Sequence, residues 1–276
     1  MFKIIDREEL SRDVVRITVE APDIVKNAQA GQFVVLIVDD KGERIPLTLA
    51  DWDKEKGTIT LIFQKTGFTT KKLGALKPSD NISHILGPLG HPTKVENFGT
   101  VVCIGGGVGA AEVYPVSRAF KLAGNRVIGI IGSRSKEHLI LENEMRRVCD
   151  ELFIATDDGS YGTKGFVTDL LKEYLGVIEK STHTIYPALV YAIGPVPMMR
   201  AVSEMTRGYQ LKTIVSLNPI MVDATGMCGV CRCKVAGKTV FGCVDGPDFD
   251  GHQIDFDQLS KRIKSFDREE RMIDEK

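Results

Sequence analysis

The first 95 residues show short apolar, β-branched runs that are separated by turn residues. The runs cover residues 14–19, 32–38 and 58–63. Between them lie Gly31, residues 39–42 and residues 53–57, which are rich in Gly and Asp. This punctuation is typical of short antiparallel strands. We therefore expect a small β-barrel domain over residues 1–95.

The pattern changes from about residue 96, where continuous apolar runs alternate with helical segments. The apolar runs are residues 100–104, 125–131, 152–156 and 188–193, and the helical segments are 110–123, 142–148 and 165–175. Continuous apolar runs are typical of buried parallel strands. Their alternation with helices predicts a doubly wound α/β domain over residues 96–215.

Four of the six cysteines fall in a segment that follows this domain, over residues 216–250. The remaining residues, 251–276, are charged and largely polar, and we expect a peripheral helix or arm there. The expected organisation therefore has four parts: 1–95, 96–215, 216–250 and 251–276.

Composition narrows the classes of function. The formal net charge is −1, with 26% charged residues, so no global basic field indicates nucleic-acid binding. Residues 1–10 lack a basic segment followed by an apolar run, which predicts no signal peptide. No apolar stretch approaches the ~20 residues of a membrane span. We therefore expect a cytoplasmic protein with no membrane partner.

The cysteine segment carries the clearest chemistry. Asp223, Cys228, Cys231 and Cys243 have the spacing D-x4-C-x2-C-x11-C. With Cys in place of Asp, the first three positions match the C-x4-C-x2-C run of plant-type [2Fe–2S] ferredoxins. Glycines within the loop allow its backbone to approach inorganic sulfide closely. These four residues are the predicted metal ligands.

Alternatives remain open for this segment. Structural zinc sites usually pair two C-x2-C units, and Cys243 has no such partner. A second alternative is that the four cysteines are unrelated residues. Cys233 competes with Asp223 as the fourth ligand, and we favour Asp223.

A glycine-rich turn follows the apolar run at 100–104. It consists of Gly105, Gly106, Gly107, Val108 and Gly109, and a helix follows it. A helix N-terminus offers free amides to a pyrophosphate, and glycines permit close approach. Alone, such a turn is often only a tight connection between strand and helix.

Two further segments stand at the ends of predicted strands in the same sheet. Ser133 and Arg134 lie where an adenosine ribose or 2′-phosphate would bind, and Gly194, Pro195 and Met198 lie near the expected nicotinamide. Each alone is equally well an ordinary loop. Together with the glycine turn they predict a dinucleotide site. Residues 157–162 also follow a predicted strand and either cover this site or form a solvated loop.

Flavin signals lie in the N-terminal part. Arg44 can neutralise a phosphate, and Thr48 can bond a flavin ring nitrogen. Gly67, Thr69 and Thr70 begin a predicted helix and can supply amides and hydroxyls to a pyrophosphate. The simpler alternative is a basic strand followed by a capped helix.

The order of these motifs resembles a known family. Residues 1–215 resemble the ferredoxin–NADP reductase superfamily. The motifs that carry this resemblance are, in order, R-x-P-L-T, G-x-T-T-x-x-L, G-P-L-G, the glycine turn and G-P-x-P-M-M. The cysteine segment and its C-V-D-G-P ending are similar to dihydroorotate dehydrogenase electron-transfer subunits. Because Asp223 stands in place of the first Cys of this segment, the chain resembles in particular the small subunits of NADH-dependent reduced ferredoxin:NADP oxidoreductases. Some of these are described as sulfide dehydrogenase beta subunits or ferredoxin–NADP reductase alpha subunits.

The resemblance implies cofactors and a partner. FAD would lie against Arg44, Pro46, Leu47 and Thr48, with its pyrophosphate near the 67–70 segment, and NAD(H) at the glycine turn. NADP(H) is an alternative. The partner would be a larger flavin and [4Fe–4S] subunit in a heterodimer, which passes one electron to ferredoxin. The other electron would reach FAD through the cluster of this chain, and then NAD+.

One residue departs from the wider pattern, and rival functions remain. Many superfamily members have Cys where this chain has Ile193, which removes a thiol from the hydride-transfer site. A dihydroorotate dehydrogenase or a sulfide or polysulfide reductase complex is the alternative within the enzyme class. A non-catalytic zinc or redox-sensing module is the alternative from another class.

Overall fold

The computed structural model describes residues 1–40, 42–180 and 186–266. The chain divides into two compact units. One unit combines Met1–Pro92 with Leu217–Pro247 and the described residues from Asp255 to Phe266, and the other combines Thr93–Ser216 with Asp248–Ile254. Both units join segments that are far apart in the sequence, so the expected division into four consecutive parts stays a prediction.

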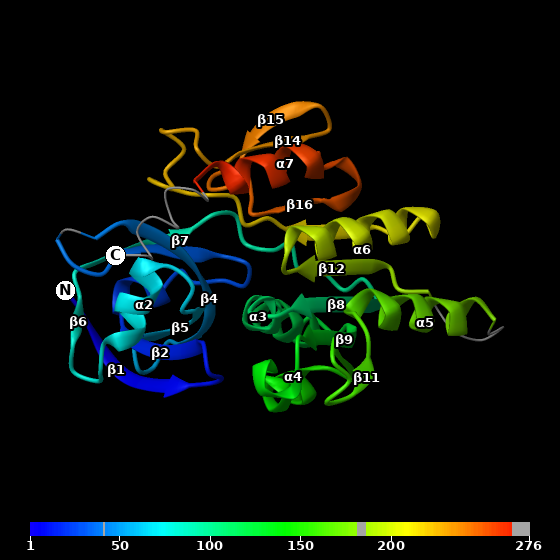
Figure 1. Cartoon of the computed structure of the whole chain (residues 1–276), viewed down its shortest axis with the longest axis horizontal. Coiled ribbons are helices and arrows are strands. Elements are labelled where there is room, and N and C mark those ends of the chain that lie inside the picture. Colours follow the sequence, from blue (N-terminus) through cyan, green and yellow to red (C-terminus); the bar gives the residue numbers. More distant parts are fainter. Residues whose placement is uncertain (41, 181–185, 267–276) are drawn as a thin grey trace. The chain divides into compact units, whose positions relative to one another are not determined.

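The first unit is built on an antiparallel sheet with strand order β6-β1-β2-β5-β4-β3-β7 (Figure 1). The strands are β1 (Phe2–Glu9), β2 (Val14–Glu20), β3 (Phe33–Ile37), β4 (Arg44–Asp53), β5 (Thr58–Gln64), β6 (Asn81–Ile82) and β7 (His84–Leu89). Two helices accompany them, α1 (Pro22–Val25) and α2 (Phe68–Ala75). The predicted β-barrel architecture is confirmed.

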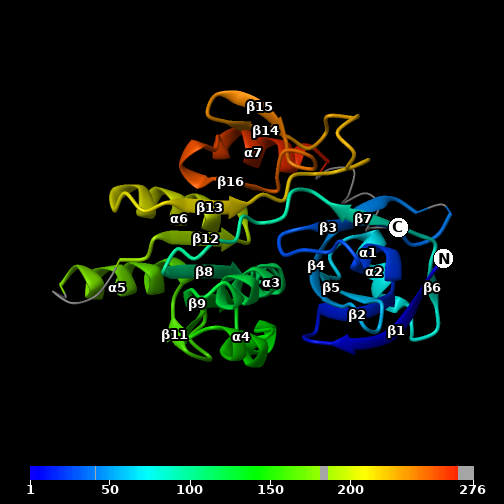
Figure 2. The ribbon, with the colours of Figure 1, turned by 180° about the vertical axis from the view of Figure 1, so that it is seen from behind.

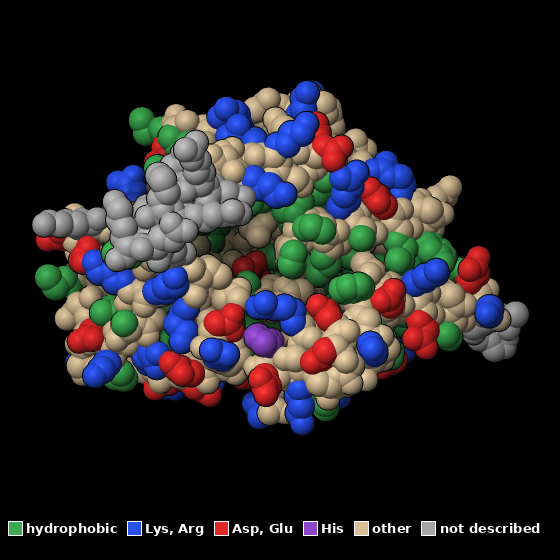
Figure 3. All heavy atoms as spheres, in the orientation of Figure 1, with side chains coloured by type: hydrophobic (Ala, Val, Ile, Leu, Met, Phe, Trp, Pro, Cys, Tyr) green, Lys and Arg blue, Asp and Glu red, His purple; other side chains and the backbone are tan. Residues whose placement is uncertain are grey.

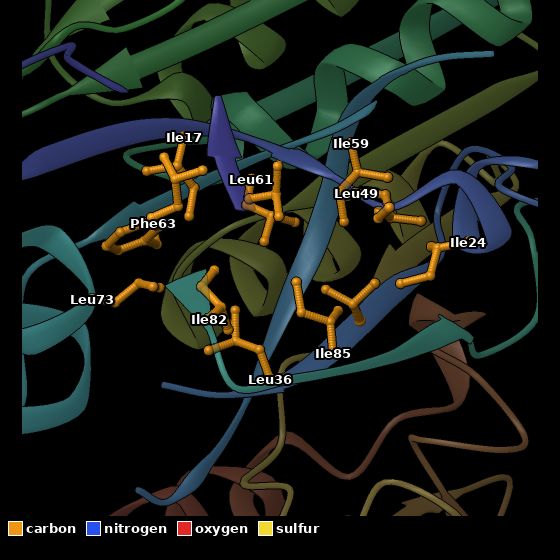
Figure 4. Packing of buried hydrophobic residues seen from close by; sticks show 14 of the residues in the cluster. Ile17, Ile24, Leu36, Leu49, Ile59, Leu61, Phe63, Leu73, Ile82 and Ile85 are labelled. Atoms are coloured by element: carbon orange, nitrogen blue, oxygen red, sulfur yellow. The ribbon is translucent and has the colours of Figure 1, made fainter. Parts of the chain in front are cut away.

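Alternation along the strands explains the core of this unit. In β2, Val15, Ile17 and Val19 are fully buried, because successive side chains of a strand point to opposite faces. Figure 4 shows Ile17 and Leu61 among the side chains that fill the interior. The core leaves the start of β4 half-exposed, from Ile45 to Thr48.

The second unit contains a sheet with strand order β11-β10-β9-β8-β12-β13-β16 (Figure 2). Its strands are β8 (Thr100–Gly106), β9 (Arg126–Ser133), β10 (Glu151–Thr156), β11 (Thr163–Lys164), β12 (Leu189–Ile193), β13 (Thr213–Ser216) and β16 (Asp248–Asp250). The connecting helices are α3 (Gly109–Leu122), η1 (Lys136–His138), α4 (Glu142–Val148), α5 (Val167–Glu179) and α6 (Val196–Gly208). Pairing is parallel except for β16, and the chain order reverses between β8 and β12. This is the predicted doubly wound domain.

The cysteine segment carries a hairpin of β14 (Arg232–Val235) and β15 (Lys238–Phe241). η2 (Gly251–Gln253), α7 (Phe256–Ile263) and η3 (Lys264–Phe266) follow. Asp255 N–H, at the start of α7, donates to the Lys234 carbonyl of β14 at 2.9 Å. The C-terminal helix is therefore bonded to the cysteine segment.

Several strands lie outside the apolar runs that predicted strands. One is β7, which covers His84–Leu89 and pairs with β3. β16 belongs to the parallel sheet as an antiparallel edge strand, although it follows the cysteine segment in sequence. None of the described helices is long and apolar enough to span a membrane.

Candidate functional site

The flavin candidates on β4 lie on a strand that pairs with β3. Pro46 pairs with Val35, Leu47 with Val34, and Thr48 with Phe33. Arg44 is exposed at the start of the strand, and Pro46, Leu47 and Thr48 are half-buried. The structure thus aligns these candidates along one strand, and they remain available to a ligand.

The second flavin segment begins helix α2. Thr70 Oγ1 accepts from the Gly67 N–H at 3.1 Å and donates to the Gly67 carbonyl at 3.0 Å. Thr69 is buried, whereas Gly67 is exposed. The Thr70 hydroxyl therefore already caps the helix, and backbone amides of the first turn are left as the phosphate-binding groups.

The glycine turn lies where the sheet order reverses. A Cβ on Gly109 would lie 2.5 Å from the Ile193 carbonyl oxygen, and a Cβ on Gly106 would lie 2.4 Å from Met198 Sδ. Gly107 has a φ of +59°, and its N–H donates to the Gly132 carbonyl at 2.8 Å. The structure thus brings the 105–109 turn together with the 193–198 segment. Close packing within the protein is one reason for these glycines.

The adenosine candidates follow β9. Ser133 is buried and donates to the Ser135 carbonyl at 2.8 Å, whereas Arg134 is exposed. The loop after β10 bonds to this segment, because the Lys136 N–H donates to Ser160 Oγ at 2.8 Å and the Asp158 N–H donates to the Arg134 carbonyl at 3.2 Å. The two loops together form the end of the sheet where a ribose would bind.

The four predicted cluster ligands form two pairs. Cys231 Sγ lies 3.2 Å from Cys243 Sγ, and both residues are buried. Asp223 Oδ2 accepts from the Cys228 N–H at 2.8 Å, and the Cys228 thiol also hydrogen-bonds this carboxylate. In the described part of the chain, no three His, Cys, Asp or Glu side chains converge on one point.

This pairing suits a binuclear cluster, in which each metal takes two protein ligands. Two thiolates about 2.3 Å from one tetrahedral metal are roughly 3.8 Å apart. The Cys231 and Cys243 sulfurs lie 3.2 Å apart, so a small outward movement lets both bind one metal. A mononuclear zinc site would need all four donors around one point. The residues present therefore fit a [2Fe–2S] cluster.

Burial shapes the chemistry of these groups. Burial, and the neighbouring Cys231, raise the pKa of the Cys243 thiol to about 12. The Gly226 N–H donates to this sulfur and lowers the same pKa. Hydrogen bonds from the Thr225 and Cys228 N–H groups lower the pKa of Asp223, as does the charge of Arg44. Cys233 is buried, and its thiol points to the Cys231 carbonyl at 3.5 Å.

The cysteine segment packs against the flavin-side strands within the same unit. Cys231, Cys243, Met221 and Ala224 form one apolar cluster with Phe33 and Val35 of β3, flanked by Leu89 and Phe241. β3 is hydrogen-bonded to β4, which carries the flavin candidates. The influence of Arg44 on Asp223 agrees with this arrangement. The cluster and flavin candidates thus lie on neighbouring elements, as direct electron transfer between them requires.

Sequence reasoning missed two side chains at the cysteine loop. Arg232 and Arg262 donate to its carbonyl groups. The spacing of Phe256, Leu259 and Ile263 at i, i+3 and i+7 was a signal that the tail forms a packed helix. No comparable signal predicted where Arg262 would reach.

Comparisons with known proteins agree with an iron–sulfur site in the cysteine segment. Residues 218–255 match the model of the iron–sulfur cluster binding domain of dihydroorotate dehydrogenase B. The chain is 41% identical to a dihydroorotate dehydrogenase B (NAD(+)) electron transfer subunit homolog of Thermotoga maritima, over 98% of this chain and 93% of that one. It is 30% identical to the corresponding subunit of Shouchella clausii, over 89% and 94%.

A solved structure is also similar over the whole chain. It belongs to an NADH-dependent reduced ferredoxin–NADP oxidoreductase that was studied for flavin-based electron bifurcation. The TM-score is 0.92 and the identity 39%, with 100% of this chain and 97% of that chain covered.

Proposed function

Because this chain belongs to the family of dihydroorotate dehydrogenase B electron-transfer subunits and their homologues, we propose that it is the electron-transfer subunit of a flavin-based electron-bifurcating NADH/NADPH:ferredoxin oxidoreductase. It is an oxidoreductase subunit of the ferredoxin reductase type, and its cofactors are FAD, a [2Fe–2S] cluster and NAD(H). The observation that carries the proposal is the full-length similarity to a bifurcating oxidoreductase.

We assign the cofactor-binding residues as follows. Arg44, Pro46, Leu47 and Thr48, with Gly67, Thr69 and Thr70, hold FAD. NAD(H) binds at Gly105, Gly106, Gly107, Val108, Gly109, Ser133, Arg134, Gly194, Pro195 and Met198. Asp223, Cys228, Cys231 and Cys243 hold the cluster, and Cys233 is the second candidate for the fourth ligand. Asp223 accepts a hydrogen bond from Cys228, whereas the Cys233 thiol points to the Cys231 carbonyl, and this contrast supports Asp223.

A bound flavin exchanges a hydride with nicotinamide and single electrons with an iron–sulfur cluster. The residues of this chain orient and shield the exchange. The glycine turn of the α/β unit presents backbone amides to a pyrophosphate. Phe33, Val35 and Leu89 enclose Cys231 and Cys243 in an apolar shell, which keeps water from these thiols. Ile193 leaves no thiol at the end of β12, so the protein contributes positioning there rather than a reactive group.

The partner is a larger catalytic subunit. We propose that this subunit carries a flavin and [4Fe–4S] clusters, that the two form a heterodimer, and that ferredoxin exchanges electrons through the larger subunit. We further propose that the complex acts in the cytoplasm. A dihydroorotate dehydrogenase complex is the second candidate, favoured by the family model over residues 218–255. A sulfide or polysulfide reductase complex is a further alternative.

Purification of the complex through a tag on this chain separates these functions. The proposal predicts a co-purified iron–sulfur flavoprotein, and reduction of NADP+ that requires both NADH and reduced ferredoxin. Recovery of a dihydroorotate-oxidising partner, with no ferredoxin-dependent reaction, would establish the second candidate instead.

A further inference from the structure

Two arginine side chains bond consecutive carbonyl groups of the loop between Cys228 and Cys231. Arg232 Nη1 donates to the Gly229 carbonyl at 2.9 Å, and Arg262 Nη2 donates to the Val230 carbonyl at 2.8 Å. Hydrogen bonds from a guanidinium are stronger than those between neutral groups. Each arginine therefore fixes the direction of one peptide group of the loop.

The opposite ends of these peptide groups point away from the arginines. In a trans peptide, the C=O of one residue and the N–H of the next lie on opposite sides. The cis peptides of the described chain lie elsewhere, before Pro88 and Pro247. The N–H groups of Val230 and Cys231 are thus turned from the guanidinium groups, and in the described residues neither donates to an acceptor.

The loop already directs another N–H at sulfur. Gly226 N–H donates to the Cys243 thiol. Consecutive backbone N–H groups that point into one concavity bind anions such as iron–sulfur clusters. The amides of Val230 and Cys231 belong to the same loop, lie on its side away from the arginines, and are donors of the kind that such a site uses.

Arg262 is brought to the loop by helix α7. Phe256 and Leu259 bury one face of the helix, and the Asp255 N–H anchors its start to β14. Figure 3 shows Lys and Arg side chains gathered over the part of the surface that carries β14, β15 and α7. Arg262 is half-buried, whereas Lys261 beside it is exposed.

We propose that Arg232 and Arg262 are positioning residues, which turn the N–H groups of Val230 and Cys231 toward the cluster and hold the loop closed around it. The inference rests on the proposed function, because it concerns the same iron–sulfur site. The positive charge of Arg262 also favours the reduced, more negative state of the cluster, and so raises its reduction potential.

The test uses the full chain, purified anaerobically with its cluster. Arg262→Gln and Arg232→Gln should release the cluster to a chelator roughly tenfold faster than the native chain, the effect of losing one hydrogen bond from a charged donor. Arg262→Gln should also lower the midpoint potential in an EPR-monitored titration. Arg262→Lys should restore the potential, because it restores the charge.

Matched controls lie beside each arginine. Lys261→Gln and Lys234→Gln remove exposed charges from α7 and β14 and should release the cluster at the native rate. FAD content should be native in all variants. Arg232 is exposed, so its substitution keeps the test valid if Arg262→Gln does not fold.

Hydrogen–deuterium exchange over residues 226–233 tests whether the two arginines hold the loop, independently of the cofactor. Faster exchange there in both arginine variants supports the inference. Native exchange and a native rate of cluster release in Arg262→Gln would overturn it. A native chain that holds no iron would refute the proposed function. The exchange comparison would still show whether Arg232 and Arg262 hold the loop.

Discussion

The close contact of Gly109 with the end of β12 gives a prediction whose size follows from the structure. A Cβ on Gly109 would lie 2.5 Å from the Ile193 carbonyl oxygen and 3.1 Å from Gly194 Cα, whereas real Cβ contacts are essentially never under 3.0 Å. Both neighbours are backbone atoms, so Gly109→Ala must displace helix α3 or strand β12. Overpacking of this kind costs about 1–3 kcal/mol.

The consequence should appear in both stability and nucleotide binding. Gly109→Ala should lower the Tm by roughly 2–4 °C per kcal/mol lost. The same displacement moves the glycine turn, so we expect NADH to bind about tenfold more weakly, a change of about 1.4 kcal/mol. Differential scanning calorimetry and fluorescence titration with NADH measure the two effects.

Gly176→Ala is the matched control. Gly176 lies inside helix α5, with no atom within 4 Å of an added Cβ and no positive φ. Alanine there should stabilise the chain by about 0.5–1 kcal/mol and leave NADH affinity unchanged. A Gly109→Ala chain with native Tm and native NADH affinity would refute the account of the glycine turn as a tightly packed strand–helix junction.

Three further predictions concern other groups. Asp248 accepts from the Tyr191 hydroxyl at 2.9 Å and the Thr93 hydroxyl at 2.7 Å, so Asp248→Ala should cost about 1–3 kcal/mol in chemical denaturation, and Asp248→Asn less. Burial raises the pKa of Asp248 in the folded chain. Its contribution to the free energy of unfolding should therefore be full below about pH 3.8 and fall as the pH rises through the folded-state pKa. Equal pH profiles of that free energy for the native and Asp248→Asn chains would contradict this. Arg44→Ala should lower the FAD content after purification, and unchanged flavin would exclude Arg44 from the site. Asp223→Ala should lower the cluster content or shift its potential, whereas an unaltered spectrum and potential would favour Cys233.

The fold class was predictable because its signals are local. Apolar runs separated by Gly and Asp marked the strands of the first unit, and the 100–104 run followed by glycines marked the start of the second. β16 was not predictable, because only three residues form it and their partner is β13, more than thirty residues earlier in the chain. Pairings at such separation are set by tertiary packing rather than by local pattern.

Some features of the candidate site were likewise predictable from local sequence, and others were not. Cysteine spacing indicated the ligand segment, yet it did not reveal that Cys231 and Cys243 pack against Phe33 and Val35. That contact depends on packing between elements, which residue spacing alone does not determine. The engagement of the Thr70 hydroxyl by Gly67 is instead local, three residues apart, and agrees with the capped helix that the sequence offered as the simpler alternative.

The most direct test of the central claim is an absorption spectrum of the anaerobically purified chain, with iron, sulfide and FAD quantified, before and after NADH is added. The account predicts two irons, two sulfides and one FAD per chain, with visible absorbance that NADH bleaches. Zinc in place of iron, with no flavin, would contradict the account and return the cysteine segment to a structural role.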